Sequence, residues 1–250
     1  MRIAGSRIWV TGASSGIGAA LAAELEQRGA HVAISARRKD KLEQVAGGRM
    51  HVEPVDVTDK AGMLAAAESI RAALGGLDVA VFNAGAWDQI SIDRWDSEVF
   101  REHFDVNLMG LVHGIEAVMP AMMAARSGSI VGVASVAGYR GIPRSEAYGA
   151  TKAAQINLLE SLRADLAPRG VHVQTVCPGF VKTEMTARNK FPMPFIIEAD
   201  QAAREIADGI AKGKAEVVFP LPMMLLMKAA RLIPVAPWTA LISRVAAQRS

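Results

Sequence analysis

The sequence predicts an α/β protein, a doubly wound and mainly parallel sheet of seven strands with helices on both faces. Short apolar runs rich in β-branched residues alternate along the chain with longer patterns typical of helices. The apolar runs are nearly continuous, which indicates strands that are covered on both sides. With 250 residues, 51% of them hydrophobic, the chain can bury one large core. No repeat or low-complexity linker divides it, so we expect a single domain over residues 1–250.

The expected elements follow one another in the order that such a sheet requires. Strands are expected at 7–11, 31–35, 51–55, 78–82, 129–134, 171–176 and 216–219. Helices are expected at 17–29, 39–46, 60–74, 98–125, 147–167 and 199–213. Thr58 is expected to cap the third helix, and Pro168 with Gly170 to end the fifth.

Composition excludes several classes of protein. The single Cys177 rules out an internal disulfide and fits a reducing, cytoplasmic location. A net charge of +3 argues against a nucleic-acid partner. The uncharged run from Ile8 to Ala23 superficially resembles the apolar core of a signal peptide, but glycines and serines interrupt it. We therefore expect neither a targeting segment nor a transmembrane helix.

A glycine-rich segment, TGASSGIG at 11–18, follows the first strand. Gly12, Gly16 and Gly18 allow a tight turn and a close approach to a ligand, and the next helix offers unpaired N–H groups to an anion. The spacing is neither G-x-G-x-x-G nor a P-loop. GASSG also satisfies G-x-S-x-G, the hydrolase elbow with Ser14 as nucleophile, but only one strand precedes it. A glycine turn without a ligand is the remaining alternative.

Several motifs together resemble the short-chain dehydrogenase/reductase family. They are TGASSGIG, NAG at 83–85, Asn107, Ser135, YGATK at 148–152 and PG at 178–179, in the family's order. The resemblance implies a Rossmann-like fold, a nicotinamide cofactor and hydride transfer between that cofactor and a carbonyl or alcohol. It also implies a homodimer or homotetramer.

Tyr148 and Lys152 are four residues apart, so their side chains share one helix face. Lowering the pKa of a tyrosine from about 10 to about 7 requires roughly 4 kcal/mol. A cation about 4 Å away supplies about that much at an effective dielectric of about 20. Lys152, helped by an oxidised nicotinamide ring, is therefore expected to make Tyr148 a general acid and base. Alone, the pair would be read as an ordinary helix-surface pair.

Two further residues are expected beside that pair. Ser135 follows an apolar strand and could donate a hydrogen bond to the substrate oxygen; alone, it would be read as a loop cap. The resemblance assigns Asn107 to a water relay toward Lys152, and gives Lys152 a second contact with the nicotinamide ribose.

The end of the second strand predicts NADP(H) rather than NAD(H). Ala36 stands where an NAD-selective acid is expected, and Arg37 and Arg38 follow it. A guanidinium can grip a 2′-phosphate, so Arg37 is expected as the principal contact and Arg38 as a secondary one; a solvated charge is the alternative for Arg38. By resemblance, the remaining cofactor contacts are Gly12, Ser14, Ser15, Gly16, Ile17, Gly18, Asp56, Val57, Asn83, Ala84, Gly85, Tyr148, Lys152, Pro178, Gly179, Val181 and Thr183.

Some residues are expected to have structural roles. Phe82 replaces an asparagine common in the family, which puts local rigidity rather than catalysis in doubt. The histidines show no ligand spacing, so no metal site is expected. Cys177 reads as a small buried residue. Tyr139 could line the substrate cavity or pack the loop.

Two late segments are expected to decide the substrate. Residues 184–200 combine charge with the apolar FPMPFII, as a lid over an apolar substrate would, although a loop buried in a subunit contact remains an alternative. The tail at 217–250 is apolar and carries +4, with Lys228, Arg231, Arg244 and Arg249 and no acid. Its prolines interrupt a helical pattern, which favours packing on the pocket or a neighbouring subunit over membrane contact.

The predicted function is NADP(H)-dependent hydride transfer to or from a carbonyl or secondary alcohol, as in a carbonyl reductase. The alternatives are a β-ketoacyl-thioester reductase of the same family and a regulatory NADP(H)-binding protein that is catalytically silent.

Overall fold

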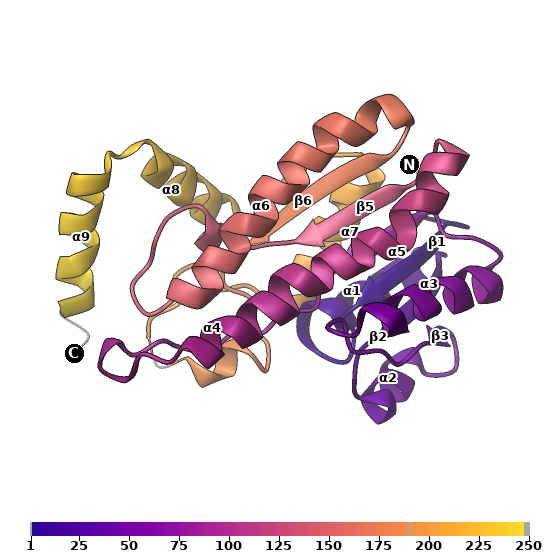
Figure 1. The fold of residues 1–250 in the computed structure, drawn as a ribbon, viewed down its shortest axis with the longest axis horizontal. Helices are drawn as coiled ribbons and strands as arrows, with labels where there is room; N and C mark the ends of the chain where they lie inside the picture. Colours follow the sequence, from indigo (N-terminus) through magenta and orange to yellow (C-terminus); the bar gives the residue numbers. More distant parts are fainter. Residues whose placement is uncertain (1, 190, 248–250) are drawn as a thin grey trace.

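A computed structural model describes residues 2–189 and 191–247. Seven parallel strands form one sheet in the order β3-β2-β1-β4-β5-β6-β7 (Figure 1). The strands are β1 (Arg7–Thr11), β2 (His31–Ser35), β3 (His51–Val52), β4 (Val79–Phe82), β5 (Ser129–Val133), β6 (His172–Pro178) and β7 (Glu216–Phe219). The predicted fold class, a Rossmann-like doubly wound sheet, is confirmed.

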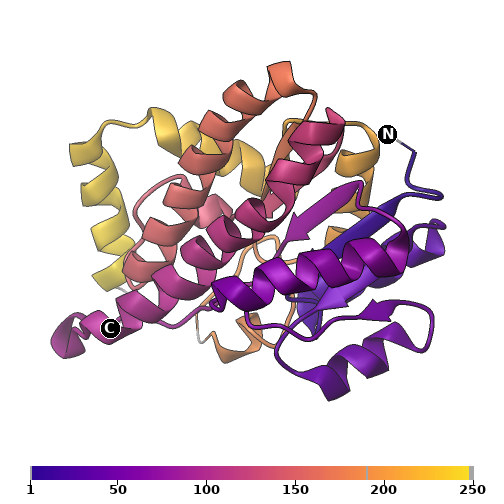
Figure 2. The same ribbon diagram turned by 45° about the vertical axis from the view of Figure 1, so that its right-hand side comes forward.

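Helices cover both faces of this sheet (Figures 1 and 2). The α-helices are α1 (Gly16–Gln27), α2 (Lys39–Ala46), α3 (Lys60–Leu74), α4 (Ser97–His103), α5 (Gly110–Ala125), α6 (Glu146–Leu166), α7 (Ala199–Ala211), α8 (Leu221–Leu232) and α9 (Val235–Ala247). One core contains the buried sides of α1, α2 and α7, and a second contains those of α3, α5 and α6. The strand order reverses between β1 and β4, where ligands of such sheets bind.

Three local predictions were wrong. The helix expected over 98–125 contains a π-helical turn, η2 (Phe104–Met109), between α4 and α5. The third strand ends at Val52, since Pro54 has no N–H to give to the ladder. The cap of α3 is Asp59, whose carboxylate accepts from the Gly62 N–H at 3.0 Å, while Thr58 donates to Asp56 instead.

The helical run Ser97–Ala125 has the length and composition of a membrane span. It packs onto the sheet through buried residues that include Leu111, Ile115 and Val118. A core helix of a layered protein has the same character.

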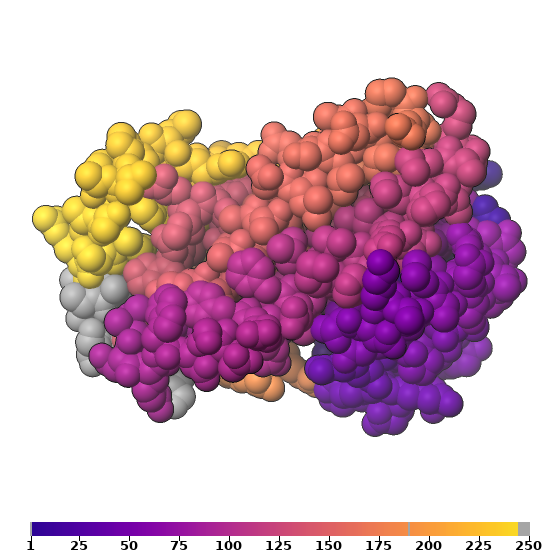
Figure 3. Space-filling view, in the orientation of Figure 1, coloured from indigo at the N-terminus to yellow at the C-terminus, as the bar shows by residue number. Residues whose placement is uncertain are grey.

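The tail forms two helices, α8 and α9, despite its prolines. Pro222 lies in the first turn of α8, where a missing N–H costs nothing. Met223 and Met227 of α8 pack on Tyr139 and Cys177. Helix α9 lies at one end of the molecule (Figure 3) and meets its body through Trp238, whose indole N–H donates to the Gly141 carbonyl at 3.0 Å.

The surface of α8 and α9 is largely apolar. Its exposed large residues are Leu221, Leu225, Leu226, Leu232, Val235 and Leu241. Arg249 of the tail and Lys190 of the segment 184–200 lie outside the described residues.

Candidate active site

A cleft of about 310 Å³ opens at the carboxyl ends of the strands. All the predicted cofactor contacts except Gly18 line it, and so does Ser135. Gly18 lies beneath the turn, where a Cβ would come within 2.4 Å of the Gly12 carbonyl oxygen. Asn107 is fully buried and is not among the residues that line the cleft.

The glycine turn and the turn after β4 are locked together. Gly12 has a φ of +66°, and a Cβ there would lie 2.7 Å from Ala84 Cα. The Asn83 side-chain amide donates to the Thr11 and Gly12 carbonyls at 3.3 and 3.2 Å. These contacts leave no space for a side chain at Gly12, so glycine is required there.

The start of α1 is suited to an anion. Ser15 is its N-cap residue, yet its side chain makes no capping hydrogen bond, and the first turn contains no acid. The N–H groups there and the helix dipole therefore favour a phosphate. With the glycine cradle, the residues present fit the pyrophosphate of a nicotinamide dinucleotide.

Basic side chains border the cleft beyond β2. Arg38 donates to the hydroxyls of Ser14 and Ser15 at 3.0 and 3.2 Å. It also lies 3.5 Å from the carboxylate of Glu184, which pairs with Lys41 at 3.1 Å. Arg37 lines the cleft and is exposed. The predicted ranking of the two arginines stays a prediction, although Arg38 has the more definite contacts.

The predicted catalytic side chains converge at the other end of the cleft. Tyr148 and Lys152 come from the first turns of α6, and Ser135 follows β5 and hydrogen-bonds with Tyr148. Gly138 makes this approach possible, because a Cβ there would lie 2.6 Å from the backbone carbon of Lys152. The sequence interpretation missed Gly138, whose only signal is a glycine in the loop after Ser135.

The expected lowering of the Tyr148 pKa by Lys152 is not found in the structure. Burial raises the pKa of Tyr148 to about 12, although the hydrogen bond with Ser135 opposes this. Burial also lowers the pKa of Lys152 to about 8. The Lys152 Nζ lies 5.4 Å from the centroid of the phenol ring and donates elsewhere. At neutral pH, Tyr148 is thus a protonated group that can give up a proton.

Asn107 is fully buried in the π-helical turn. Its side-chain amide donates to Thr151 Oγ1 at 3.0 Å and to the Ala86 carbonyl at 3.1 Å, and accepts from the Ala86 N–H at 2.6 Å. Its backbone carbonyl accepts from Gln155 Nε2 at 2.5 Å. Gln155 in turn accepts from Lys152 Nζ at 3.0 Å.

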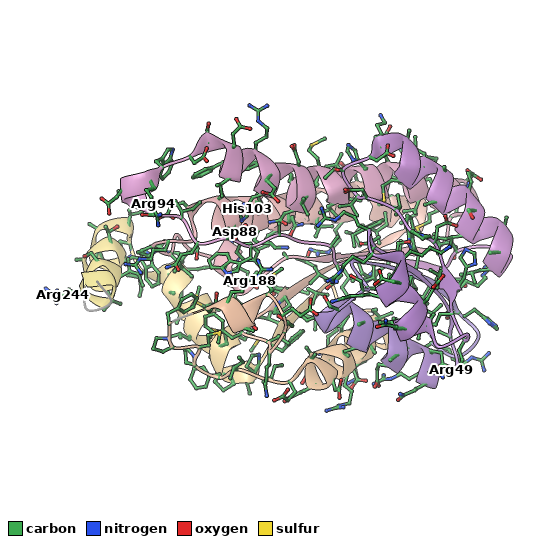
Figure 4. The ribbon with its side chains drawn as sticks, turned by 90° about the horizontal axis from the view of Figure 1, so that it is seen from below. Arg49, Asp88, Arg94, His103, Arg188 and Arg244 are labelled. Atoms are coloured by element: carbon green, nitrogen blue, oxygen red, sulfur yellow. The ribbon has the colours of Figure 1, made fainter. Side chains whose placement is uncertain are left out.

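Trp87 packs beside Tyr148, a contact that the sequence interpretation also missed. Its ring meets that of Tyr148 edge to face, with centroids 5.2 Å apart. Its indole N–H donates to Asn189 Oδ1 at 2.9 Å, which joins it to the predicted lid. The next residue, Asp88, donates its backbone N–H to His103 Nε2 at 3.0 Å, tying this loop to α4 (Figure 4).

Three other residues discussed in the sequence analysis, Cys177, Tyr139 and Phe82, pack inside the protein. Cys177 is buried, and burial raises its thiol pKa to about 12. Tyr139 is buried and donates to Glu216 at 2.5 Å, away from the cleft. Phe82 packs edge to face on Trp9 with centroids 6.0 Å apart. In residues 2–189 and 191–247, no group of three or more side chains is arranged to hold a metal ion.

Comparisons with known proteins agree with this geometry. The sequence profile of the short chain dehydrogenase family matches residues 6–192. The uncharacterized oxidoreductase of Myxococcus xanthus (strain DK1622) is 41% identical over 233 residues, covering 90% of this chain and 91% of that protein.

Two solved structures are similar over most of the chain. A short chain dehydrogenase from Burkholderia cenocepacia J2315 in complex with NADP has a TM-score of 0.84 and 30% identity, over 98% of both chains. A short chain dehydrogenase/reductase from Burkholderia phymatum in complex with NAD has a TM-score of 0.82 at 24% identity, over 91% of this chain and 93% of that one. The second likeness concerns the fold alone.

Proposed function

The chain belongs to the short-chain dehydrogenase/reductase family, and on that premise we propose that it is an NADP(H)-dependent oxidoreductase acting on apolar carbonyls or secondary alcohols. The observation that carries the proposal is the convergence of Ser135, Tyr148 and Lys152 at one end of a cleft whose other end is an anion-binding helix start. Neither the three side chains nor the start of α1 would by itself support hydride transfer.

The preference for NADP(H) rests on charge. Arg37 and Arg38 border the cleft at the end of β2, beside Ala36 in place of an acid. A 2′-phosphate would find two guanidinium groups there and no carboxylate on that strand end. Glu184 lies against Arg38 from the other side, and the phosphate would have to displace it. The NADP of the similar Burkholderia cenocepacia protein is consistent with this assignment.

A nicotinamide bound in the cleft supplies or accepts the hydride. Ser135 Oγ donates a hydrogen bond to the carbonyl oxygen of the substrate, and the hydroxyl of Tyr148 donates a second. As negative charge builds on that oxygen, Tyr148 passes its proton to it. The pKa of about 12 favours the protonated phenol, which is the form that ketone reduction needs. Lys152, when charged, stabilises the tyrosinate that remains.

The substrate end favours an apolar compound. Trp87 covers one side of Tyr148, and Phe180 packs on Phe191 of the lid segment with ring centroids 6.1 Å apart. We assign the lid role to residues 184–200 because Met185 and Thr186 line the cleft and Asn189 holds Trp87.

The test is a panel of aldehydes, ketones and β-ketoacyl thioesters, with oxidation of NADPH and of NADH followed by absorbance. We expect turnover with NADPH on apolar ketones and much weaker turnover with NADH. Binding of NADPH without turnover on any member would instead support a catalytically silent binding protein.

A further inference from the structure

We propose that Gln155 is a positioning residue for this reaction, holding the ammonium group of Lys152 at the cleft by bridging it to the backbone carbonyl of Asn107. The proposal rests on the proposed function, because it assigns Gln155 a part in the same site. It replaces a mobile water relay, expected from the family resemblance, with a fixed side-chain amide.

The bridge uses both ends of the amide. Gln155 Oε1 accepts from Lys152 Nζ at 3.0 Å, and Gln155 Nε2 donates to the Asn107 carbonyl at 2.5 Å. Gln155 lies one turn after Lys152 on α6, so the two side chains share a helix face. With 2% of its surface exposed, its amide has little access to bulk water. An unmade hydrogen bond there would be costly, which fixes the orientation.

The carbonyl that receives this bond belongs to the π-helical turn. In Phe104–Met109 the wider turn shifts the backbone hydrogen bonds away from the α-helical pattern, and the Gly110 N–H donates to Asp105 instead. The same turn places the side chain of Asn107 against Thr151 of α6. Asn107 thus anchors both α6 and the amide that reaches Lys152.

Neutral hydrogen-bond acceptors stabilise the charged form of Lys152. Its side chain is buried and donates to the Val133 carbonyl at 2.9 Å and to Gln155 Oε1 at 3.0 Å. The titratable groups that face it are Tyr148 on α6 and Cys177 on β6, both neutral at neutral pH. Among the described residues, Lys152 forms no ion pair, and no carboxylate contributes to the shift of its pKa. Removing an acceptor should therefore discharge the lysine more readily.

A second buried glutamine provides a matched control. Gln174 on β6 is 1% exposed and donates through Nε2 to the Lys214 carbonyl at 2.7 Å. It resembles Gln155 in burial and in its bond to a backbone carbonyl, but it contacts no predicted catalytic residue. A purely structural role for buried glutamines would make the two sites respond alike.

The test follows the titration of Lys152 by NMR in protein with isotope-labelled lysine, the signal being assigned from Lys152→Arg. Gln155→Met keeps the side-chain length and removes the acceptor, so the Lys152 midpoint should fall by about one pH unit. Gln155→Glu adds a carboxylate and should raise the midpoint. Gln174→Met should leave it unchanged. The alkaline limb of the kcat profile should move in the same directions.

An unchanged Lys152 midpoint in Gln155→Met, or an equal shift in Gln174→Met, would overturn the proposal. Circular dichroism and thermal melting check folding; if Gln155→Met does not fold, the upward shift in Gln155→Glu decides. The titration requires no substrate. A wild-type protein without NADPH-linked turnover would thus refute the proposed function while the NMR result still tests the bridge.

Discussion

The two ends of the active-site cleft are built in different ways. At the cofactor end, backbone turns contact one another so closely that Gly12 and Gly18 have no room for a Cβ. At the substrate end, side chains from distant segments meet, as when Trp87 bonds Asn189 across 102 positions of sequence. Backbone contacts of the first kind restrict residue type, whereas contacts of the second kind can be made by many side chains.

This difference explains which chemistry can be inferred for each end. The proposed cofactor end would bind a ligand common to the whole family. Its turns therefore carry a short and specific sequence motif. Near the catalytic side chains, Met223 of α8 packs behind Gly179, which lines the cleft. A Cβ at Gly179 would lie 2.8 Å from the Met223 Cγ.

Tyr148→Phe should lower kcat by about 10²–10⁴-fold, the usual contribution of a positioned acid. NADPH affinity should change little, because the hydroxyl acts on the substrate oxygen. The other tyrosine is a matched control: Tyr139→Phe removes a hydrogen bond to Glu216 away from the cleft and should keep turnover. Steady-state kinetics and NADPH fluorescence titration measure both. Full turnover by Tyr148→Phe would refute the assigned acid.

Gly138→Ala should lower kcat by about 10²-fold, since a displacement of the Ser135 loop by about 1 Å has effects of that size. The new Cβ would lie 2.6 Å from the Lys152 backbone carbon, so the loop must move away from α6. Gly141→Ala is the control, with no atom within 4 Å of its Cβ. Equal kinetics for the two variants would contradict the role given to Gly138.

Arg37→Asp and Arg38→Asp should each lower kcat/KM for NADPH by roughly 10-fold or more and affect NADH little, because a charge-assisted contact to the 2′-phosphate contributes about that much. Arg49→Asp is the control, because Arg49 is not among the residues that line the cleft and pairs with Glu26. An unchanged NADPH preference in both cleft variants would remove the basis of the cofactor assignment.

The rate of ketone reduction should fall as the pH rises through about 8. The pKa of Lys152 is lowered by burial to about 8, so its ammonium is lost above that pH. Tyr148, with its pKa raised to about 12, stays protonated over the same range. A kcat profile at saturating NADPH measures this limb. A rate that rises through pH 8 would contradict the stabilising role of Lys152.

Trp87→Phe should raise KM for an apolar ketone by a few-fold, about the effect of one lost hydrogen bond. The ring contact with Tyr148 survives, while the bond to Asn189 is lost. Trp95→Phe is the control, because Trp95 is 57% exposed and stacks on Phe100. A change in NADPH affinity instead of KM for the ketone would assign Trp87 to the cofactor end.

Much of the fold could be predicted because each parallel strand carries its own apolar run between helical patterns. The elements that were predicted wrongly have local causes. Pro54 shortens β3. The π-helical turn could not be predicted because the apolar pattern continues through it from α4 to α5. Prolines at helix starts hid α8 and α9, since proline is favourable in a first turn and unfavourable later.

Most residues carried by short motifs line the cleft, whereas Gly18 and Asn107 do not, and their functional roles stay predictions. Gln155 and Trp87 were missed because their roles depend on a partner 48 or more positions away, and nothing adjacent in sequence marks them. The pKa of Tyr148 was misjudged for a related reason. Charge spacing along a helix can be read from sequence, but the burial that outweighs it cannot.

The most direct test of the account is to supply NADPH deuterated at the hydride-donating carbon of its nicotinamide, with an apolar ketone that the wild-type protein reduces. Mass spectrometry of the alcohol should show one deuterium on the former carbonyl carbon, formed far more slowly by Tyr148→Phe. An alcohol without deuterium, or none from any ketone although NADPH binds, would contradict hydride transfer in this cleft.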